Sequence, residues 1–213
     1  SRRVMAFKEL PNLDQCRPFA YDRESTDRGS RIGGTAPANA KPYISDVYSK
    51  YFSTIEFETG WAVSLFYSFE IFGNDETRDI ISFNNQVLFP SNLIQAVVHK
   101  GGESAGTSEI KAEVTCQRVR FESIQTDRMT DYPEYVKPWS KVGGRPFIDN
   151  IARVGPAFDE LEQNGYRQLF QFDTPDPSRQ SYIDGFPWDP GWLHVFVRGE
   201  YLNDADFAFV VQQ

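Results

Sequence analysis

Four aspartates have the greatest capacity for chemistry in this chain. They lie between residues 165 and 209 and are Asp173, Asp176, Asp184 and Asp189. Clustered carboxylates can act as a general acid and base, or offer oxygen ligands to a hard cation. Their spacing matches no EF-hand loop, and the neighbouring prolines at 175, 177 and 190 make a series of turns a sufficient explanation. A carboxylate or cation site and a plain turn-rich loop therefore stay open as alternatives.

Histidine and cysteine are too few to build the common catalytic and metal sites. The histidines are His99 and His194, so a His-rich metal centre is excluded. His194 falls in an aromatic run typical of a buried strand, which favours a structural role. Cys16 and Cys116 have no local group that would lower a thiol pKa, which argues against a cysteine nucleophile. Two cysteines make no disulfide framework, and we expect reduced thiols in a cytoplasmic protein.

Several other functional classes leave no trace in the chain. No Walker motif, dinucleotide-binding fingerprint or basic RNA-binding patch is present. No apolar run approaches the roughly 20 residues that cross a bilayer, and no apolar leader is visible near the first residues. We therefore expect no cofactor, no bound metal, no nucleic acid and no membrane among the partners.

The charge of the chain is unevenly distributed. The net charge is −8, and from Ala157 onward ten acidic residues face three basic ones, a net −7. A one-sided negative surface repels nucleic acid and membranes and attracts basic proteins. A solvated surface that keeps the protein dispersed would have the same composition, so both interpretations stay open.

Apolar periodicity and a 15% aromatic content predict many strands and few helices. Helices are predicted over residues 1–10, 42–52 and 156–164, with Gly165 at the C′ position of the third. A long half-buried strand with a bulge near residues 117–118 is predicted over 109–124. Other strands are predicted over residues 53–57, 62–72, 80–83, 87–89, 93–99, 169–172, 192–197 and 207–211.

A short motif occurs twice and suggests an internal repeat. Residues 30–34 and 140–144 both have a serine, a basic residue, a β-branched residue and two glycines. The glycines are Gly33, Gly34, Gly143 and Gly144. We therefore predict an α+β, β-rich fold of two similar antiparallel-sheet halves, a pseudo-duplication, with a few short helices. The halves span residues 29–124 and 138–213, a polar connector covers 125–137, and residues 1–213 form a single globular domain.

The second half carries a set of further motifs. A basic residue precedes Gly-Gly-x-Pro-aromatic at residues 141–147, with Pro146, and a Leu-x-Gln-aromatic-Asp strand follows at 169–173. A turn from Trp188 to Gly191 then precedes an aromatic strand and an acidic-Leu turn. Together these motifs resemble the YwqG-like family of bacterial domains of unknown function, most clearly over residues 138–213. Members of that family often lie among bacterial toxin and immunity genes, so the resemblance implies an immunity role.

These observations predict an immunity or antitoxin-type protein, without chemistry of its own, that neutralises a basic, nuclease-like toxin. The expected contact surface joins acidic residues to aromatic anchors, and consists of Asp173, Asp176, Tyr182, Asp184, Asp189, Trp192 and Glu200. Trp188 is expected to be buried beneath the loop that joins two neighbouring strands. A ligand- or cation-binding domain, and an enzyme that uses the carboxylates of residues 173–189, are the alternatives.

Overall fold

The computed structural model describes residues 3–43, 46, 48–68, 81–83, 94–106, 110, 112, 114–127, 140–149, 151–175, 182–188 and 191–212, without the side chains of residues 81–83 and 153. The strands found there are β1 (Gln15–Tyr21), β2 (Arg31–Ile32), β3 (Lys50–Glu56), β4 (Trp61–Tyr67), β5 (Ile81–Phe83), β6 (Ile94–Lys100), β7 (Gln117–Phe121), β8 (Gln125–Thr126), β9 (Lys141–Gly143), β10 (Arg167–Asp173), β11 (Trp192–Arg198) and β12 (Asp206–Gln212). The helices are α1 (Ile151–Gln163) and the short 3-10 helix η3 (Leu202–Asp204). The prediction of a β-rich chain is confirmed.

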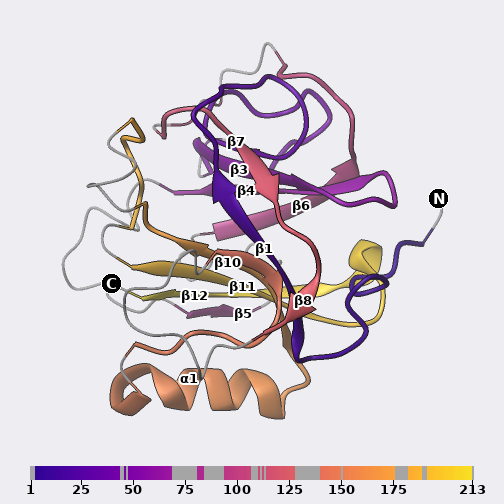
Figure 1. The fold of residues 1–213 in the computed structure, drawn as a ribbon, viewed down its shortest axis with the longest axis vertical. Coiled ribbons are helices and arrows are strands. Elements are labelled where there is room, and N and C mark those ends of the chain that lie inside the picture. The colour runs from indigo at the N-terminus through magenta and orange to yellow at the C-terminus, as the bar shows by residue number, and fades with distance from the viewer. Residues whose placement is uncertain are drawn as a thin grey trace.

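These strands join in one antiparallel sheet (Figure 1). Its order is β5-β12-β11-β10-β9-β1-β7-β2-β3-β4-β6, and β8 pairs with β1 off this path. The sheet curls into a nearly closed, barrel-like shape, with β10, β11 and β12 in one layer and β3, β4 and β6 in the other. β1 crosses between the layers, pairing with β9 through Cys16–Pro18 and with β7 through Phe19–Tyr21.

Aromatic side chains fill the space between the two layers. Phe52 of β3 contacts Phe172 of β10 at a ring-centroid distance of 5.0 Å, and Trp188 at 4.5 Å. Phe57 stacks on Phe170 at 5.9 Å. All but Phe57 are buried, so burial of these rings is a main source of stability for the fold.

The outer face of each layer has its own cover. Helix α1 lies on the outer face of the β10–β12 layer, where Phe158 packs on Phe196 at a centroid distance of 5.8 Å. The outer face of the β3–β6 layer is covered by segments that carry Ala36, Ala40 and Tyr48. Helix α1 therefore covers the outer face of one layer, and loop segments cover the outer face of the other.

The strand arrangement is partly alike on the two sides of the β1–β7 pair. On each side, a short strand at a Gly-Gly step comes first and three further strands follow in chain order, but β5 then extends the sheet beyond β12 on one side. β3 and β10 each contain a register shift, one around Phe52 and one around Leu169.

The Gly-Gly steps share one backbone conformation. The φ angles are 69° and 81° at Gly33 and Gly34, and 73° and 74° at Gly143 and Gly144. Positive φ is a conformation that glycine adopts at little cost. A Cβ at Gly33 would also lie 2.7 Å from the Thr115 carbonyl oxygen, so close approach is a second requirement there.

Four predicted elements differ from the structure. The described residues 3–10 contain no helix, and residues 50–52 begin β3 where a helix was predicted. The strand predicted over 109–124 is reduced to β7. α1 begins at Ile151, ahead of the predicted start at Pro156, because Val154 extends the buried stripe of Phe158 and Leu161 by one turn. The strand predicted at 87–89 lies outside the described residues.

In the residues that the structure describes, no helix combines the length and the apolar character that crossing a membrane requires.

Candidate functional site

Asp173 does not lie on an exposed acidic surface. It is the last residue of β10, is 5% exposed, and pairs across the sheet with Trp192. Its backbone N–H donates to Ser140 Oγ at 2.9 Å, and its carbonyl accepts from the Tyr21 hydroxyl at 3.0 Å. The prediction of an exposed contact at Asp173 is therefore corrected: its place at the end of a central strand encloses it. Trp192 is half-buried and packs on Phe147 at a ring-centroid distance of 4.7 Å.

Tyr182 and Asp184 tie the loop between β10 and β11 to the rest of the chain. The Tyr182 hydroxyl donates to the Tyr21 carbonyl at 3.2 Å, and the Arg23 guanidinium lies 4.8 Å from the Tyr182 ring centroid. Asp184 is exposed, and its backbone exchanges hydrogen bonds with Thr115 at 2.9 and 3.1 Å. Their predicted role as partner contacts stays a prediction.

The described part of this loop offers no set of cation ligands. Asp173 is enclosed in the sheet, whereas Asp184 is exposed on the loop. Asp176 and Asp189 lie outside the described residues. Among the residues that are described, no group of three His, Cys, Asp or Glu is placed to hold a metal ion.

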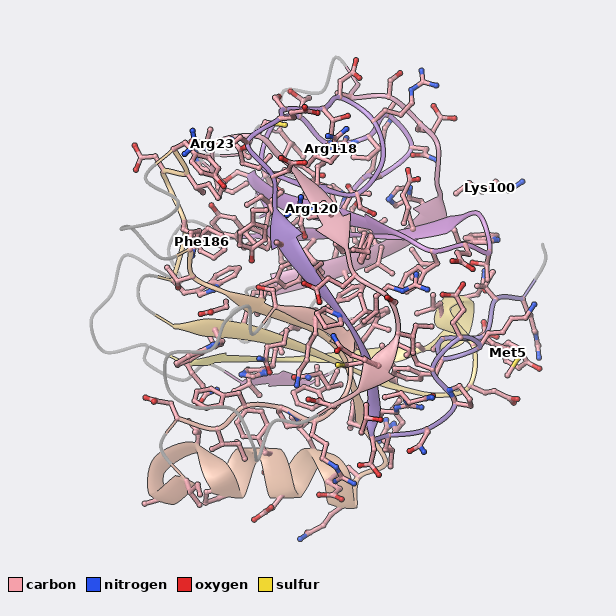
Figure 2. The ribbon with its side chains drawn as sticks, in the orientation of Figure 1. Met5, Arg23, Lys100, Arg118, Arg120 and Phe186 are labelled. Carbon is pink, nitrogen blue, oxygen red and sulfur yellow. The ribbon has the colours of Figure 1, made fainter. Side chains whose placement is uncertain are left out.

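Glu200 lies at the opposite end of the molecule from this loop. It follows the far end of β11, so the strand separates it from Trp192 by about 20 Å. Its carbonyl accepts the Ala6 N–H at 2.9 Å, beside Met5. Figure 2 shows Met5 and Phe186 at opposite sides of the molecule. The predicted contact residues therefore do not form one surface, a correction that follows from the strand's direction.

Trp188 is buried as predicted. It is 1% exposed and contacts Phe52 and Phe186 at ring-centroid distances of 4.5 and 4.9 Å. Its indole N–H donates to the Phe172 carbonyl at 3.3 Å. Gly191 is fixed by its N–H, which donates to the Thr174 hydroxyl at 2.9 Å. The predicted pairing of the strands on either side of the loop is confirmed, as β10 and β11 are neighbours. Pro146 is half-buried.

His194 is held neutral inside the β10–β12 layer. Its Nδ1–H donates to Gln168 Oε1 at 2.7 Å, and its Nε2 accepts from Gln212 Nε2 at 2.6 Å. An amide oxygen accepts and an amide nitrogen donates, so these partners select one tautomer. Burial, with a smaller contribution from the Lys141 charge, lowers the pKa of His194 to about 3. The ring therefore serves the fold.

His99 has a serine at catalytic distance, but both are enclosed. Ser64 Oγ lies 2.7 Å from His99 Nε2, and His99 Nδ1 lies 2.9 Å from the Lys100 carbonyl. Since a carbonyl accepts, Nδ1 carries the proton and Ser64 donates to Nε2. Thr54 and Tyr51 continue this chain of hydroxyls at 2.7 and 2.5 Å. Ser64 is fully buried, so its hydroxyl does not meet a substrate in this conformation.

Cys16 lies beside an enclosed ion pair. Lys141 Nζ is 2.6 Å from Asp127 Oδ2, and these side chains are 2% and 0% exposed. Burial, with a smaller contribution from the Asp127 charge, raises the pKa of Cys16 to about 11. The protonated thiol is a poor nucleophile at neutral pH. Cys116 donates to the Thr26 carbonyl at 3.2 Å, and both cysteines are free.

A pocket opens at the end of the molecule that carries Met5. The N-terminal segment, β1, the β3–β4 turn, β7 and β9 contribute to it. Its apolar walls are formed by Phe7, Ile55, Phe57, Phe121 and Val142. The space for water-sized groups is about 30 Å³, whereas pockets for drug-sized molecules measure roughly 300–1,000 Å³. The pocket therefore suits one short side chain better than a large ligand.

Arg17 is shared between Glu9, which lines this pocket with it, and Glu58, whose exposed side chain lies outside the lining. Arg17 Nη2 lies 3.2 Å from Glu9 Oε2 and 3.5 Å from Glu58 Oε1. Burial raises the pKa of Glu9, and the hydrogen bond to Glu58 raises it further, while the Arg17 charge opposes both. A carboxyl group with a perturbed pKa in a pocket marks a candidate functional site.

The sequence did not predict this pocket, because no local sequence pattern marks its residues. Glu9, Arg17 and Glu58 come from three separate segments and meet only through the sheet. The turn signal in Glu58-Thr59-Gly60 between two apolar runs was available, but turn residues are commonly exposed and carry no function.

Comparison with known proteins gave no match. The chain fits no protein-family model, and no curated protein or solved structure matches it.

Proposed function

We propose that this chain is an immunity or antitoxin-type protein, which binds and neutralises a basic, nuclease-like toxin without chemistry of its own. We place the contact surface at the acidic end, defined by Glu9, Glu58, Glu160, Glu162 and Glu200. The observation that carries the proposal lies beside the pocket, where Glu9 and Glu58 share the Arg17 guanidinium and Lys8 is the other cation near Glu9. A positively charged partner would offset the excess of carboxylates on this surface, and this charge complementarity favours binding.

Contacts along the chain support the gathering of these residues at one end. Residues 4–6 run beside the β11–β12 connection, as the Ala6–Glu200 hydrogen bond indicates. The Arg198 guanidinium lies 4.9 Å from the centroid of the Tyr166 ring, so the end of α1 adjoins the same connection. In Figure 1 the N-terminal segment, η3 and the turn between β3 and β4 lie on one side of the molecule.

Helix α1 carries glutamates near its C-terminal end, where negative charge lowers the stability of a helix. Glu160 and Glu162 are exposed near its C-terminal end, and its last turn has no basic residue. Negative charge is unfavourable there because the helix dipole places partial negative charge at the same end. A local cost of this kind is expected where a surface serves binding.

Ion pairs offset the charge of some acidic residues at this end, including Glu9 and Glu58, which share Arg17. Asp204 pairs with Arg3 at 3.7 Å, and Asp206 pairs with Arg198 at 2.6 Å. Within the described part of the chain, Glu160, Glu162 and Glu200 form no ion pair. Their charge is available to steer a basic protein toward this end, most strongly at low salt.

Co-expression with the protein encoded beside it tests the proposed function. We expect this chain to restore growth to cells that express the toxic neighbour, and the two proteins to purify as a complex. Absence of a complex would contradict the proposal, as would rescue by a variant chain that cannot bind.

One observation favours a second candidate, an enzyme that uses carboxylates. The raised pKa of Glu9, beside the second carboxylate of Glu58, is an arrangement that general acids also use. In this candidate, Glu9 and Glu58 take the catalytic role that the sequence suggested for the carboxylates of residues 173–189, since Asp173 is enclosed. Turnover of a small substrate by the isolated chain, abolished by Glu9→Gln, would favour it over neutralisation.

We also propose that the two halves arose by duplication within one domain, as the repeated motif and the resemblance to YwqG-like domains suggest. Arg31 Nη2 donates to the carbonyl of Thr35, and Lys141 Nζ to that of Arg145, which supports an equivalent role for the two basic residues. Free cysteines are in keeping with a cytoplasmic location. An experimental structure with unrelated surroundings for the two Gly-Gly steps would contradict the duplication.

A further inference from the structure

We infer that the pocket beside Met5 takes the apolar end of a leucine side chain from the partner, with basic residues on either side of that leucine. This inference rests on the proposed function, because it names the group through which the basic partner docks. The occupant follows from the apolar lining, the balanced charge of that lining, the size of the pocket and the carboxylates around it.

Four large apolar side chains are left partly uncovered at this pocket. Met5 is 43% exposed, and the rings of Phe7, Phe57 and Phe121 are only partly buried against the core. All four line the pocket, and Figure 2 shows Met5 at the edge of the molecule. We call these four side chains the apolar patch. An exposed apolar surface with charged residues around it is typical of a protein–protein contact.

Contacts outside the pocket fix the rings of the apolar patch. The Arg167 guanidinium lies 3.8 Å from the centroid of the Phe7 ring, and its Nη2 also donates to the Leu10 carbonyl at 2.5 Å. Phe57 stacks on Phe170 at a ring-centroid distance of 5.9 Å. A pocket that is formed before binding loses less conformational entropy when the occupant enters. The partner therefore meets a preformed recess.

The charged residues in the lining balance one another. Lys8 and Arg17 are the positive ones, and Glu9 and Glu56 are the negative ones. When all four are ionised, the lining has no net charge to attract a cation or an anion. A charged occupant would also give up its hydration on entry, whereas an apolar one has none to lose. The lining therefore favours an apolar side chain.

The size of the pocket limits the occupant to the end of one aliphatic side chain. The space for water-sized groups is about 30 Å³, and one water molecule needs roughly 10–15 Å³ on this measure. That space suits the branched methyl groups of a leucine and is too small for an aromatic ring. Leucine also carries its branch one carbon further from the backbone than valine does, so it reaches further into a recess.

Two exposed carboxylates beside the pocket favour a basic partner. The Glu58 side chain is 71% exposed, and the Arg17 guanidinium 3.5 Å away also pairs with Glu9. Glu200 is exposed, and its carbonyl accepts the N–H of Ala6, which lines the pocket. In a two-fold contact a second copy of this chain would bring the same carboxylates toward these two. A basic partner brings the opposite charge, so it is the better match.

Titration of the full chain with short peptides tests the inference. The probe is the acetylated and amidated tripeptide lysine-leucine-lysine, and the readout is the methyl resonance of Met5. With isotope-labelled methionine the chain has two such resonances, from Met5 and Met129, and Met5→Leu assigns them. In one control peptide alanine replaces the leucine. In a second control peptide glutamates replace both lysines.

We expect a saturable Met5 shift with a dissociation constant of about 1–10 mM for the leucine peptide. The alanine peptide should bind about tenfold more weakly, because it buries fewer methyl groups, and the glutamate peptide about threefold more weakly or worse. No shift with the leucine peptide, or equal binding of any two of the three peptides, would overturn the inference. A Met5 shift that depends on protein concentration alone would place a second copy in the pocket and also overturn it.

Two alanine variants test whether the apolar patch holds the leucine. Phe7→Ala removes one wall and should weaken binding of the leucine peptide about fivefold or more. Leu13→Ala is the matched control, since Leu13 is 49% exposed on the same segment and lies outside the lining, and it should leave the titration unchanged. Equal effects of the two variants would contradict the inference. If Phe7→Ala does not fold, the peptide series on the native chain decides.

The two proposals can fail separately. If the toxin complex forms and folded Phe7→Ala binds the toxin as tightly as the native chain, the leucine inference is wrong and the proposed function stands. If the leucine peptide binds as expected but no toxin complex forms, the pocket is an apolar docking site and the proposed function is wrong.

Discussion

Enclosure fixes the protonation states of both histidines and of Cys16. His194 and His99 are each held in one neutral tautomer by their partners, and Cys16 is enclosed with a raised thiol pKa. These are the residue types from which nucleophilic catalysis is most often built. Glu9, by contrast, is a partly buried carboxyl beside a second carboxylate, that of Glu58.

His194 makes stability depend on pH. In the unfolded chain it takes up a proton near pH 6.5, whereas in the folded chain it stays neutral down to about pH 3. Its contribution is therefore present above pH 6.5 and is lost below, by up to about 1.4 kcal/mol per pH unit. We predict that His194→Gln reduces the loss of unfolding free energy between about pH 7.5 and 5.5 by about 1 kcal/mol. Urea denaturation at both pH values measures it, and an unchanged pH slope would contradict the assignment.

Trp188 is the side chain on which the packing beneath the β10–β11 loop depends. We predict that Trp188→Ala lowers the free energy of unfolding by about 3–5 kcal/mol, since it leaves a cavity beside Phe52 and Phe186. Trp192→Ala is the matched control, and its loss should be smaller because Trp192 is half-buried. A melting temperature unaffected by Trp188→Ala would show that the ring does not support the core.

At the scale of the element, continuous apolar runs predicted strands well and irregular ones predicted them badly. β4, β6, β10, β11 and β12 lie where apolar runs predicted them. The helix predicted over residues 42–52 failed because β3 begins at Lys50 and is buried on both faces. Tyr51 packs on the outer face and Phe52 in the inner core, so adjacent residues are both apolar and resemble part of a helical pattern.

The Gly-Gly step after β2 gives a prediction at this scale. Gly33→Ala should cost more stability than Gly60→Ala, although both positions have positive φ, 69° and 87°. Each substitution pays about 1–2 kcal/mol for the conformation. A Cβ at Gly33 would also collide with the carbonyls of Val114 and Thr115, whereas nothing lies within 4 Å of one at Gly60. We expect an additional loss of about 1–3 kcal/mol in Gly33→Ala, measured by urea denaturation. Equal losses would contradict this close approach.

At the scale of the molecule, the sequence shows an excess of acidic residues in the second half but does not show where these residues lie in the fold. Asp173 and Glu200 both belong to that excess, yet one is enclosed in the sheet and the other lies at the far end of β11. The pocket could not be predicted, because Glu9, Arg17 and Glu58 meet through pairings between distant strands. Local sequence patterns do not show which distant residues come into contact in the fold.

The affinity of the toxin complex for two charge-reversed variants tests the central claim most directly. Glu160→Lys with Glu200→Lys changes the acidic end, and Asp149→Lys with Asp184→Lys changes the opposite end by the same charge. The proposal predicts that the first pair weakens binding about tenfold or more and flattens its dependence on salt between about 50 and 300 mM, while the second changes it less than about threefold. The reverse order would place the contact surface at the loop between β10 and β11 and contradict the proposal.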